Sequence, residues 1–372
     1  MKYYIIAGEA SGDLHGANLI KAIKRQDANA TFRCWGGDLM QAQGAEVIKH
    51  YRDLAFMGFI EVVKNLPAIF KNIRFCKEDI LQYAPDVLIF IDYPGFNLRI
   101  ASFAKAHQIK TVYYISPQIW AWKQSRVHQI KRDIDKMLVI LPFEKAFYQG
   151  FDFEVDFVGH PLLDAIQSLE IPDGDFRLKN DLSQKPIIAL LPGSRKQEII
   201  SMLPNMMSVV NEFPEYQFVV AVAPGQNKSF YSNLIKNYPV KLVQGATYSL
   251  LQNAAAALVT SGTATLETAL FNVPEVVCYK GSRISYAIAK RIVKVKYISL
   301  VNLIMDKMIV DELIQDDLNP QKLKISLTTI LEKNNRELIQ QNYQSLKEKL
   351  GGPGASDRAA QKILDFLKAA QK

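Results

Sequence analysis

Short runs of apolar residues alternate along the chain with longer stretches of helical periodicity. Each run is a continuous series of Val, Ile, Leu and Tyr rather than an alternation of apolar and polar positions, which is typical of parallel strands covered by helices on both faces. The pattern therefore predicts an α/β protein with doubly wound parallel sheets. The expected strands are 2–8, 86–93, 110–116, 136–142, 186–193, 217–224, 255–262 and 275–281.

The series of strands is interrupted once. After 155–166 the chain passes through a polar, proline-bearing stretch, and a new series of strands and helices begins at Pro186. Two tandem Rossmann-like domains that meet near 160–185 explain this break better than one wide sheet, and 372 residues suit two such domains. We expect the ligand to bind between them. The sequence Gly-Gly-Pro-Gly at 351–354 precedes a last amphipathic helix, which we expect to pack back on the first domain.

Charge and cysteine content narrow the class of protein. The 45 basic and 37 acidic residues give a net charge of +8, so an anionic partner is expected: nucleic acid, nucleotide or membrane surface. Cys34, Cys76 and Cys278 are too far apart for a disulfide framework or a paired metal site, which indicates a reducing, cytoplasmic setting. No apolar stretch approaches the roughly 18 residues of a membrane-spanning helix, and the first run is too short for a secretory signal. Any membrane contact should therefore be peripheral.

The loop after the strand 255–262 is the first candidate site. It presents backbone N–H groups at a helix N-terminus with hydroxyl groups beside them, which suits a diphosphate, and Glu267 one turn later suits a ribose diol. The alternative is that the hydroxyls and Glu267 cap the helix around a tight turn at Gly262. The candidate residues are Ser261, Gly262, Thr263, Ala264, Thr265 and Glu267.

A second candidate loop, 192–195, follows the strand 186–193. Gly193 permits a close approach of the ligand, and Arg195 offers a charged fork for phosphate, or else a surface salt bridge. Neither loop matches the P-loop or the GxGxxG pattern, which disfavours a nucleotide hydrolase or a dinucleotide enzyme. The histidines show no ligand spacing with acids or cysteines, so we expect no metal site.

Two strands of the first domain also end in candidate residues. Small residues at 8–12 would let a ligand approach the end of the first strand, or they form a turn that Ser11 or Asp13 caps. Asp92 follows the buried strand 86–93 and is either a general base facing the ligand or a cap for the next turn. His160, in Gly-His-Pro, is expected to be structural.

Three regions combine cations with apolar bulk, as an interfacial patch against anionic lipid would. Residues 280–296 carry six basic residues and no acid, 56–71 is apolar with interspersed lysines, and Trp120 and Trp122 lie beside Lys123 and Arg126. The alternative is a set of core-facing segments with lysines in solvent. No RNA-binding motif is present.

Taken together, these segments resemble the lipid-A-disaccharide synthase family in order and spacing, over essentially the whole chain. Three of the motifs, WAWK, LPGSR and SGTATLE, are specific in combination. The matching segments are 7–17, 91–97, 113–127, 141–148, 157–164, 190–199, 260–267 and 297–304.

The resemblance implies a GT-B glycosyltransferase with two Rossmann-like domains facing across a cleft. Residues 1–166 with the returning helix 351–372 would form the acceptor- and membrane-facing domain, and 167–350 would bind the UDP-sugar. The implied reaction transfers 2,3-diacylglucosamine from its UDP donor to 2,3-diacylglucosamine 1-phosphate. The implied setting is peripheral, on the cytoplasmic face of the inner membrane, with no cofactor and no nucleic acid. We also consider a homodimer, which no segment of the sequence requires.

By position in the family motifs, Asp92 is the first candidate for the base that activates the acceptor hydroxyl. Glu9, Ser11 and Asp13 would line the same pocket. His15 is the rival base, because it follows the first strand on the same side. A single base is sufficient for in-line attack with inversion.

The resemblance also implies which residues bind the nucleotide. Arg195 and the backbone amides of 261–265 would meet the charge on the leaving UDP in place of magnesium, Glu267 would take the ribose hydroxyls, and Asn302 would help to hold the nucleotide. Some members carry a second acid where this chain has Gly95, so no role for that acid is transferred.

Two other classes of protein remain as alternatives. A UDP-N-acetylglucosamine-type epimerase of the same architecture would bind the same nucleotide but would need no apolar lip for acyl chains. A basic nucleic-acid-binding protein would show binding that falls steeply with salt.

Overall fold

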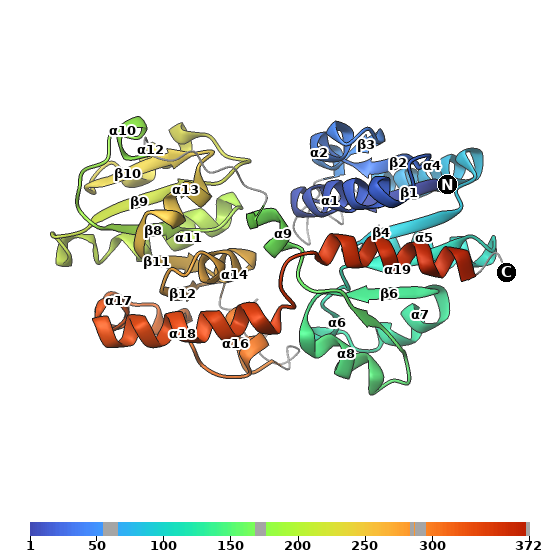
Figure 1. Cartoon of the computed structure of the whole chain (residues 1–372). Coiled ribbons are helices and arrows are strands. Elements are labelled where there is room, and N and C mark those ends of the chain that lie inside the picture. Colours follow the sequence, from blue (N-terminus) through green and yellow to red (C-terminus); the bar gives the residue numbers. More distant parts are fainter. Residues whose placement is uncertain (55–65, 168–175, 283–285, 287–294, 370–372) are drawn as a thin grey trace. The chain divides into compact units, whose positions relative to one another are not determined.

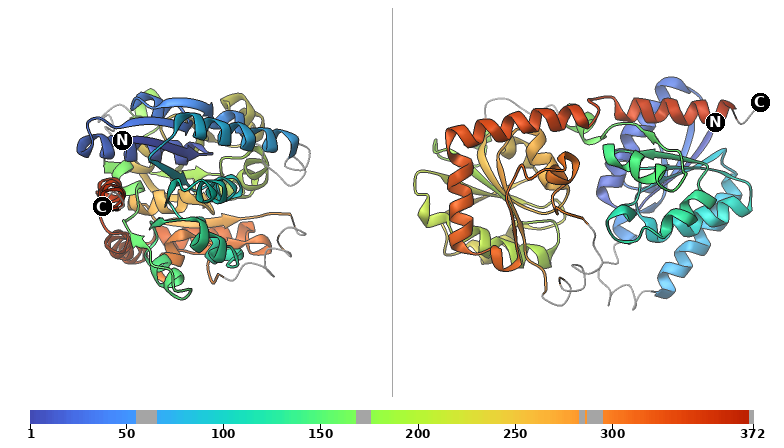
Figure 2. Two further views of the ribbon diagram at one scale, coloured as in Figure 1. Left: turned by 90° about the vertical axis from the view of Figure 1, so that its right-hand side faces the viewer. Right: turned by 90° about the horizontal axis from the view of Figure 1, so that it is seen from below.

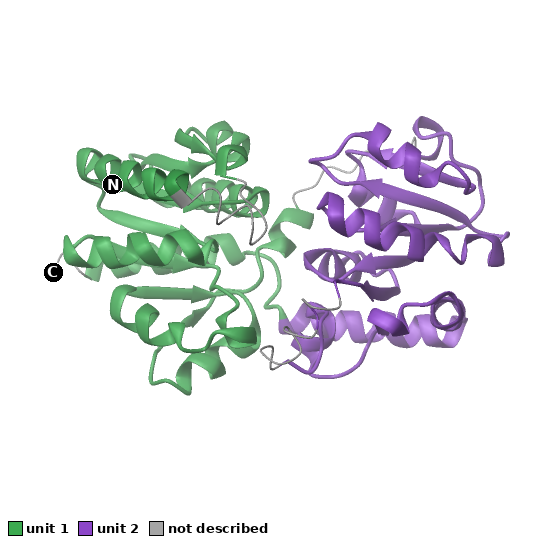
Figure 3. Ribbon diagram, turned by 180° about the vertical axis from the view of Figure 1, so that it is seen from behind, with its two compact units in different colours: residues 1–168, 350–372 green, residues 169–349 purple. Residues whose placement is uncertain are grey.

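The computed structural model describes residues 1–54, 66–167, 176–282, 286 and 295–369 (Figure 1). The chain divides into two compact units, Met1–Ser168 with Leu350–Lys372 and Leu169–Lys349 (Figure 3). Each unit contains one parallel sheet with packed helices, which confirms the prediction of an α/β protein with two Rossmann-like folds.

Unit 1 contains a seven-stranded sheet in the order β3-β2-β1-β4-β5-β6-β7, and its described pairs are all parallel. Its strands are β1 (Lys2–Ala7), β2 (Thr31–Gly36), β3 (Glu46–His50), β4 (Val87–Ile91), β5 (Lys110–Tyr114), β6 (Lys136–Val139) and β7 (Asp156–Phe157). Its helices are α1 (Ala10–Gln26), α2 (Asp38–Ala42), the 3-10 turn η1 (Tyr51–Leu54), α4 (Leu66–Tyr83), α5 (Pro94–Ala106), α6 (Ile119–Trp122), α7 (Arg126–Asp133), α8 (Pro142–Gln149), α9 (Leu162–Gln167) and α19 (Ala355–Ala369).

The central strands of unit 1 are buried on both faces. Tyr4 and Ile6 of β1 belong to the core that also contains residues of α4 and α5, and Tyr3 and Ile5, which point the opposite way, are equally 0% exposed. The helices form two packed groups, α1 with α2 and α19, and α5 with α4 and α7. This double coverage explains the continuous apolar runs of the central strands.

Unit 2 contains a six-stranded parallel sheet in the order β10-β9-β8-β11-β12-β13. Its strands are β8 (Ile187–Leu191), β9 (Gln217–Val222), β10 (Val240–Gln244), β11 (Ala254–Thr260), β12 (Glu275–Tyr279) and β13 (Glu312–Ile314). Its helices are α10 (Phe176–Lys179), α11 (Lys196–Met207), η2 (Val210–Glu212), α12 (Lys228–Ile235), α13 (Thr247–Gln252), α14 (Thr263–Leu270), α16 (Leu300–Met305), η3 (Gln315–Asp317), α17 (Pro320–Leu331) and α18 (Lys333–Lys349).

Each of the eight predicted strands is present, but five observed strands were missed. The missed strands are β2, β3, β7, β10 and β13. Four of these, β3, β7, β10 and β13, lie at a sheet edge and are short or only partly buried: β3 has one exposed and four half-buried residues, and β7 has two residues. A partly covered strand needs fewer apolar residues, so it lacks the continuous run by which the central strands are recognised.

The last helix, α19, red in Figures 1 and 2, packs against α1 in unit 1. Asp164 accepts hydrogen bonds from the backbone N–H groups of Gly354 (2.6 Å) and Ser356 (2.8 Å) and so caps the start of α19. Arg358 donates to the carbonyls of Val158 (2.8 Å) and Pro353 (2.7 Å). The segment 158–164 is therefore the attachment point of the returning helix.

Candidate active site

The ends of β1 and β4 bring the first candidate residues together. The two strands are parallel neighbours with Ala7 opposite Ile91, so Glu9 and Asp92 follow adjacent strand ends at the carboxyl edge of the sheet. Gly8 lies against the ring of Tyr93, where a β-carbon would be 2.5 Å from Cγ. Open α/β sheets bind their ligands at this edge.

The backbone around Asp92 is strained and strongly held. Asp92, Tyr93 and Ile115 have φ angles of +44°, +49° and +67°, a region that residues other than glycine rarely adopt. The Asp92 carbonyl accepts hydrogen bonds from Nδ2 of Asn97 (2.7 Å) and the hydroxyl of Tyr113 (2.5 Å), and its N–H donates to Ile115 (3.3 Å). Strain of about 1–3 kcal/mol per residue persists where the surrounding structure enforces it, which is frequently at functional sites.

The pKa of the Asp92 carboxyl is raised toward neutral pH. The residue is open to solvent, but the protein atoms around its carboxyl remove part of its hydration, and this desolvation together with the charge of Glu9 raises its pKa to about 6. Burial and Glu9 also raise the pKa of Tyr93. A carboxylate with this pKa is a suitable general base near neutral pH.

Asp13 makes structural contacts, and its place in the lining of the pocket stays a prediction. Its side chain is 2% exposed and accepts backbone hydrogen bonds from Gly37 (2.8 Å), Leu39 (3.0 Å) and Met40 (3.1 Å). These contacts cap α2 and hold the loop after β2. Ser11, by contrast, is exposed on the first turn of α1 and stays a candidate for substrate contact.

His15, the predicted rival base, is buried near Asp164 and His160, and its role as a base stays a prediction. It is 8% exposed, its Nδ1 has no hydrogen-bond partner among the described residues, and burial lowers its pKa to about 4, opposed by the charge of Asp164. Burial and His15 lower the pKa of His160 to about 3. His160 accepts a hydrogen bond from the N–H of Leu162 (3.2 Å) and donates its own N–H to Leu350 (3.0 Å). Both histidines thus belong to the attachment of α19.

In unit 2, the loop after β8 is closed by an acid that the sequence analysis missed. Glu198 accepts hydrogen bonds from the N–H groups of Ser194 and Arg195, both at 3.3 Å, and its other oxygen lies 3.6 Å from the exposed Arg195 guanidinium. Gly193 has a φ of +104°, and a β-carbon there would be 2.7 Å from Oε2 of Glu198. The glutamate at the third helical position is a capping-box signal and was readable in the sequence. An anion at this loop has to compete with Glu198.

The loop after β11 lies beside it, because β8 and β11 are paired with Leu191 opposite Val259. Ser261 donates to the carbonyl of Ile298 (2.9 Å), and the hydroxyl of Thr265 donates to Gly262 (2.8 Å). Gly262 has a φ of +155° and open space where a β-carbon would stand.

The first N–H groups of α14 complete this loop. Thr263 is exposed and Ala264 half-buried, and within the described residues no acceptor is found for their N–H groups. Unpaired donors at the positive end of a helix form a suitable anion site. The contacts of Ser261 and Thr265 fit the capping interpretation, and with the free donors of α14 the diphosphate site stays a prediction.

Glu267 is held by a second residue that the sequence analysis missed. The hydroxyl of Tyr248 donates to Oε1 of Glu267 (3.1 Å), and the Tyr248 ring stacks on Phe271 at 5.3 Å. Burial raises the pKa of Glu267, and the bond from Tyr248 opposes this change. Glu267 therefore keeps one fixed orientation near the loop 261–265.

The side chain of Asn302 makes four hydrogen bonds within unit 2, and its role in holding the nucleotide stays a prediction. It is fully buried; its amide nitrogen donates to Val310 and Glu312, both at 2.9 Å, and its oxygen accepts from the N–H groups of Ile309 (2.7 Å) and Val310 (3.1 Å). Glu312 also accepts from the N–H of Ile298 (2.8 Å). Asn302 therefore supports the segment whose carbonyl binds Ser261.

Parts of the predicted membrane surface lie outside the described residues. Residues 283–285 and 287–294 of the first segment and 56–65 of the second fall there. Across the described ranges, no helix is long and apolar enough to cross a membrane, and no cluster of three or more His, Cys, Asp or Glu residues could hold a metal ion. Cys34, Cys76 and Cys278 are free and buried.

Comparison with solved structures establishes the class of fold as GT-B. A UDP-GlcNAc 2-epimerase from Neisseria meningitidis, bound to UDP-GlcNAc, matches with a TM-score of 0.70 and 13% identity over 98% of this chain and 100% of that chain. A calicheamicin glycosyltransferase matches with a TM-score of 0.61 and 15% identity over 99% of this chain and 98% of that chain. At such low identity these likenesses concern the fold alone.

Sequence comparison then identifies the family. The family model described as lipid-A-disaccharide synthetase matches residues 3–366. Lipid-A-disaccharide synthases from Syntrophus aciditrophicus and Psychromonas ingrahamii are 40% and 39% identical, each over 98% of this chain and 97% of the relative. The chain belongs to the lipid-A-disaccharide synthase family of glycosyltransferases. The epimerase and nucleic-acid-binding alternatives are not favoured.

Proposed function

We propose that the chain transfers 2,3-diacylglucosamine from its UDP donor to the 6-hydroxyl group of 2,3-diacylglucosamine 1-phosphate (lipid X). The products are a β-1′,6-linked disaccharide 1-phosphate and UDP. The names of the relatives, which match over 98% of this chain, support the reaction. The structural observation that carries the proposal is the proximity of Asp92 and Glu9, which helps to raise the pKa of Asp92 to about 6.

In the proposed chemical step, Asp92 is the general base. It takes the proton of the acceptor 6-hydroxyl while that oxygen forms a bond to the anomeric carbon of the donor. The bond from this carbon to the diphosphate oxygen breaks, and UDP leaves with the electron pair. Attack from the side opposite the leaving group inverts the anomeric centre, and one base is sufficient for it. Glu9 tunes Asp92, and the exposed Ser11 contacts the acceptor.

We propose that the two neighbouring loops of unit 2 bind UDP. The unpaired N–H groups of Thr263 and Ala264 and the guanidinium of Arg195 would stabilise the charge that develops on the diphosphate. Arg195 must then exchange its contact with Glu198 for one with phosphate. Glu267, fixed by Tyr248, would accept hydrogen bonds from the ribose hydroxyls. This proposal includes no metal and no organic cofactor.

The proposal places the enzyme on the cytoplasmic face of the inner membrane, in peripheral contact with anionic lipid. The net charge of +8 supports this placement, because anionic lipid attracts basic protein surfaces. Co-sedimentation with vesicles of phosphatidylglycerol and phosphatidylethanolamine tests it, and binding that does not depend on the anionic lipid would contradict it.

A homodimer is part of the proposal too, and light scattering measures the oligomeric state.

The decisive experiment incubates the purified chain with both diacylated substrates and follows UDP and disaccharide by mass spectrometry. Asp92→Asn should lower turnover by about 10²–10⁴-fold while UDP binding is retained. Asp86→Asn is the matched control: this exposed residue precedes the same strand at its opposite end, where it accepts the N–H of Lys2 (2.7 Å). Absence of product from the wild-type chain, or near-normal turnover by Asp92→Asn, would overturn the proposal.

A further inference from the structure

The segment between β5 and α7 contains one exposed tryptophan, and the residues just before it are buried. Ile119 and Trp120 are 1% and 8% exposed, and the Trp120 ring packs edge-on against Phe143 at 4.9 Å. Trp122, two residues further on, is 48% exposed. The third tryptophan, Trp35, is fully buried. An exposed indole on an anchored segment offers a large, rigid contact surface to a ligand.

Two cations lie beside this indole. The Arg126 guanidinium is 5.2 Å from the centre of the Trp122 ring, and Lys123 is exposed next to it in sequence. Within the described part of the chain, neither cation forms an ion pair with a carboxylate. Arg132, at the other end of α7, pairs with Asp133 at 2.7 Å. The cluster of Trp122, Lys123 and Arg126 therefore has positive charge available for a ligand.

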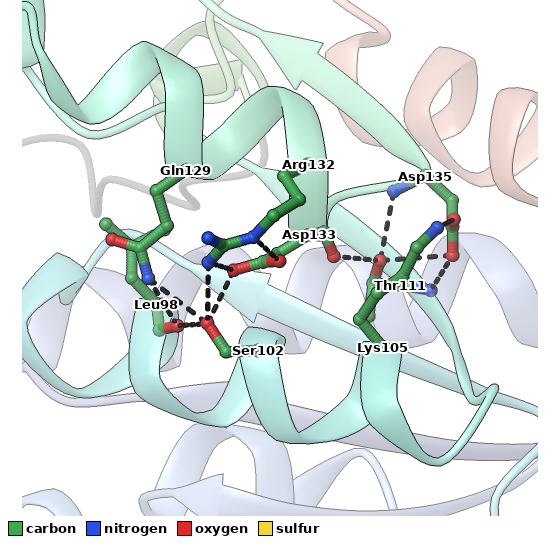
Figure 4. A network of polar contacts seen from close by, with 8 residues as sticks. All are labelled: Leu98, Ser102, Lys105, Thr111, Gln129, Arg132, Asp133 and Asp135. Carbon is green, nitrogen blue, oxygen red and sulfur yellow. Dashed lines mark hydrogen bonds and ion pairs between the residues drawn. The ribbon is translucent and has the colours of Figure 1, made fainter.

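The backbone of Arg126 has a defined position, because a polar network holds α7 against α5 (Figure 4). Gln129 donates to the carbonyl of Leu98 (3.1 Å), and the hydroxyl of Ser102 donates to Asp133 (2.5 Å). Arg126 is the first residue of the helix that carries Gln129 and Asp133. Its guanidinium thus extends from a defined position, as a specific binding group requires.

The cluster lies on the same edge of the sheet as Asp92. β5 is the neighbour of β4, with Tyr114 opposite Ile91, and the N–H of Asp92 donates to the carbonyl of Ile115 just after β5 (3.3 Å). Tyr113, whose hydroxyl donates to Asp92 (2.5 Å), has its pKa raised well above the usual value by burial, and the positive charge of Arg126 opposes this. The chain that leads to the cluster is therefore bonded to the backbone of Asp92 where it leaves β5.

We propose that Trp122, Lys123 and Arg126 form the subsite for a sugar 1-phosphate, the polar head of the acceptor. The indole would lie against the apolar face of the sugar ring, and the guanidinium and ammonium would bind the phosphate. The identification of this ligand as the acceptor of the reaction rests on the proposed function. The site places the phosphate and the reacting hydroxyl of one molecule on one edge of unit 1.

The binding test uses Trp122 as its own reporter, because the other two tryptophans are buried. Glucosamine 1-phosphate should change the emission of the full chain and protect it from iodide quenching, glucosamine should do neither, and inorganic phosphate should bind more weakly. Arg126→Gln should weaken binding of glucosamine 1-phosphate about tenfold or more, since a hydrogen bond to a charged group is lost. Lys131→Gln, which alters an exposed lysine further along α7, should leave binding unchanged.

Equal binding of glucosamine 1-phosphate by the wild-type chain and Arg126→Gln would overturn the site. A second outcome would also overturn it: no response to the sugar phosphate, but a Trp122 response to phosphatidylglycerol vesicles that Arg126→Gln removes. That result would assign the cluster to the membrane surface instead. Neither measurement needs turnover, so failure of the site and failure of the proposed reaction are distinguishable.

Kinetics supply the second arm of the test. Arg126→Gln and Lys123→Gln should raise KM for lipid X and leave KM for the UDP donor unchanged. An acceptor that lacks the 1-phosphate should be poor for the wild-type chain, and Arg126→Gln should discriminate against it much less. Trp122→Leu should raise the acceptor KM with either acceptor, because it removes the sugar contact only. An unchanged preference for the phosphate in Arg126→Gln would contradict the proposal.

Discussion

The ring of Tyr93 lies directly against Gly8, so that a β-carbon at position 8 would be 2.5 Å from Cγ of Tyr93. The contact joins the ends of β1 and β4 at the point where Glu9 and Asp92 leave the sheet. The positions of the Glu9 and Asp92 carboxylates therefore depend on glycine, which has no side chain, at position 8.

Gly8→Ala should therefore move Tyr93 and disturb Asp92. We expect a loss of about 1–3 kcal/mol in the free energy of unfolding, as for other overpacked sites, together with a large fall in kcat. Urea denaturation and steady-state kinetics measure the two effects. Gly95→Ala is the matched control, since nothing lies within 4 Å of a β-carbon there. Equal effects of the two changes would show that the contact with Tyr93 is unimportant.

The pH dependence of the reaction should report Asp92. The base must be ionised, and its pKa is about 6, so kcat/KM should fall as the pH is lowered through 6. Glu9→Gln removes a negative charge that raises this pKa, so the acid limb should shift to lower pH. Rates between pH 4.5 and 8.5 for the two proteins test this. An acid limb at the same pH in both would exclude the coupling.

The ionised carboxylate of Asp92 should also lower the free energy of unfolding. Its folded-state pKa of about 6 lies above the ordinary value of 3.8 for aspartate, so the folded chain binds the proton more tightly and loses stability as the pH rises from about 4 through 6. Asp92→Asn removes this cost. Its free energy of unfolding should exceed that of the wild-type chain at pH 8, with little difference at pH 3.5. A constant difference across this range would show that the charge is not involved.

Gly262→Ala should weaken UDP binding. Gly262 has a φ of +155°, which an L side chain rarely adopts, so alanine would rearrange the loop that presents the N–H groups of Thr263 and Ala264. Isothermal titration with UDP should show a loss of about tenfold or more, equivalent to about 1.4 kcal/mol. Gly225→Ala, at a glycine without positive φ and with open space around it, is the control. Unchanged UDP affinity in Gly262→Ala would place the nucleotide elsewhere.

Asp13→Ala should act on stability rather than on substrate affinity. The carboxylate satisfies three buried or half-buried N–H groups, and each group left unpaired costs about 1–3 kcal/mol. Chemical denaturation should show a large loss, whereas Asp38→Asn, which removes an exposed partner of Arg52, should change stability by less than about 1 kcal/mol. A stable Asp13→Ala protein with a raised acceptor KM would restore the original pocket role.

The sequence by itself determined the central strands and the two Rossmann-like folds, and it predicted candidate sites in the loops at the strand ends. Continuous apolar runs are a local consequence of burial on both faces, and glycine and hydroxyl residues at a strand end have local conformational meaning. That is why the strands at 2–8, 86–93 and 255–262 were predicted without coordinates, and why Asp92 became a candidate residue.

Only the tertiary structure decided which polar residues are free to act. Asp13 and Asn302 have side chains that suit a ligand, but distant backbone groups at 37–40 and 309–310 use their hydrogen bonds. Tyr248 matters because its hydroxyl donates to Glu267, and His15 is buried near Asp164 and His160, which hold the start of α19. Hydrogen bonding depends on which groups meet in space, and this is fixed by packing rather than by position along the chain.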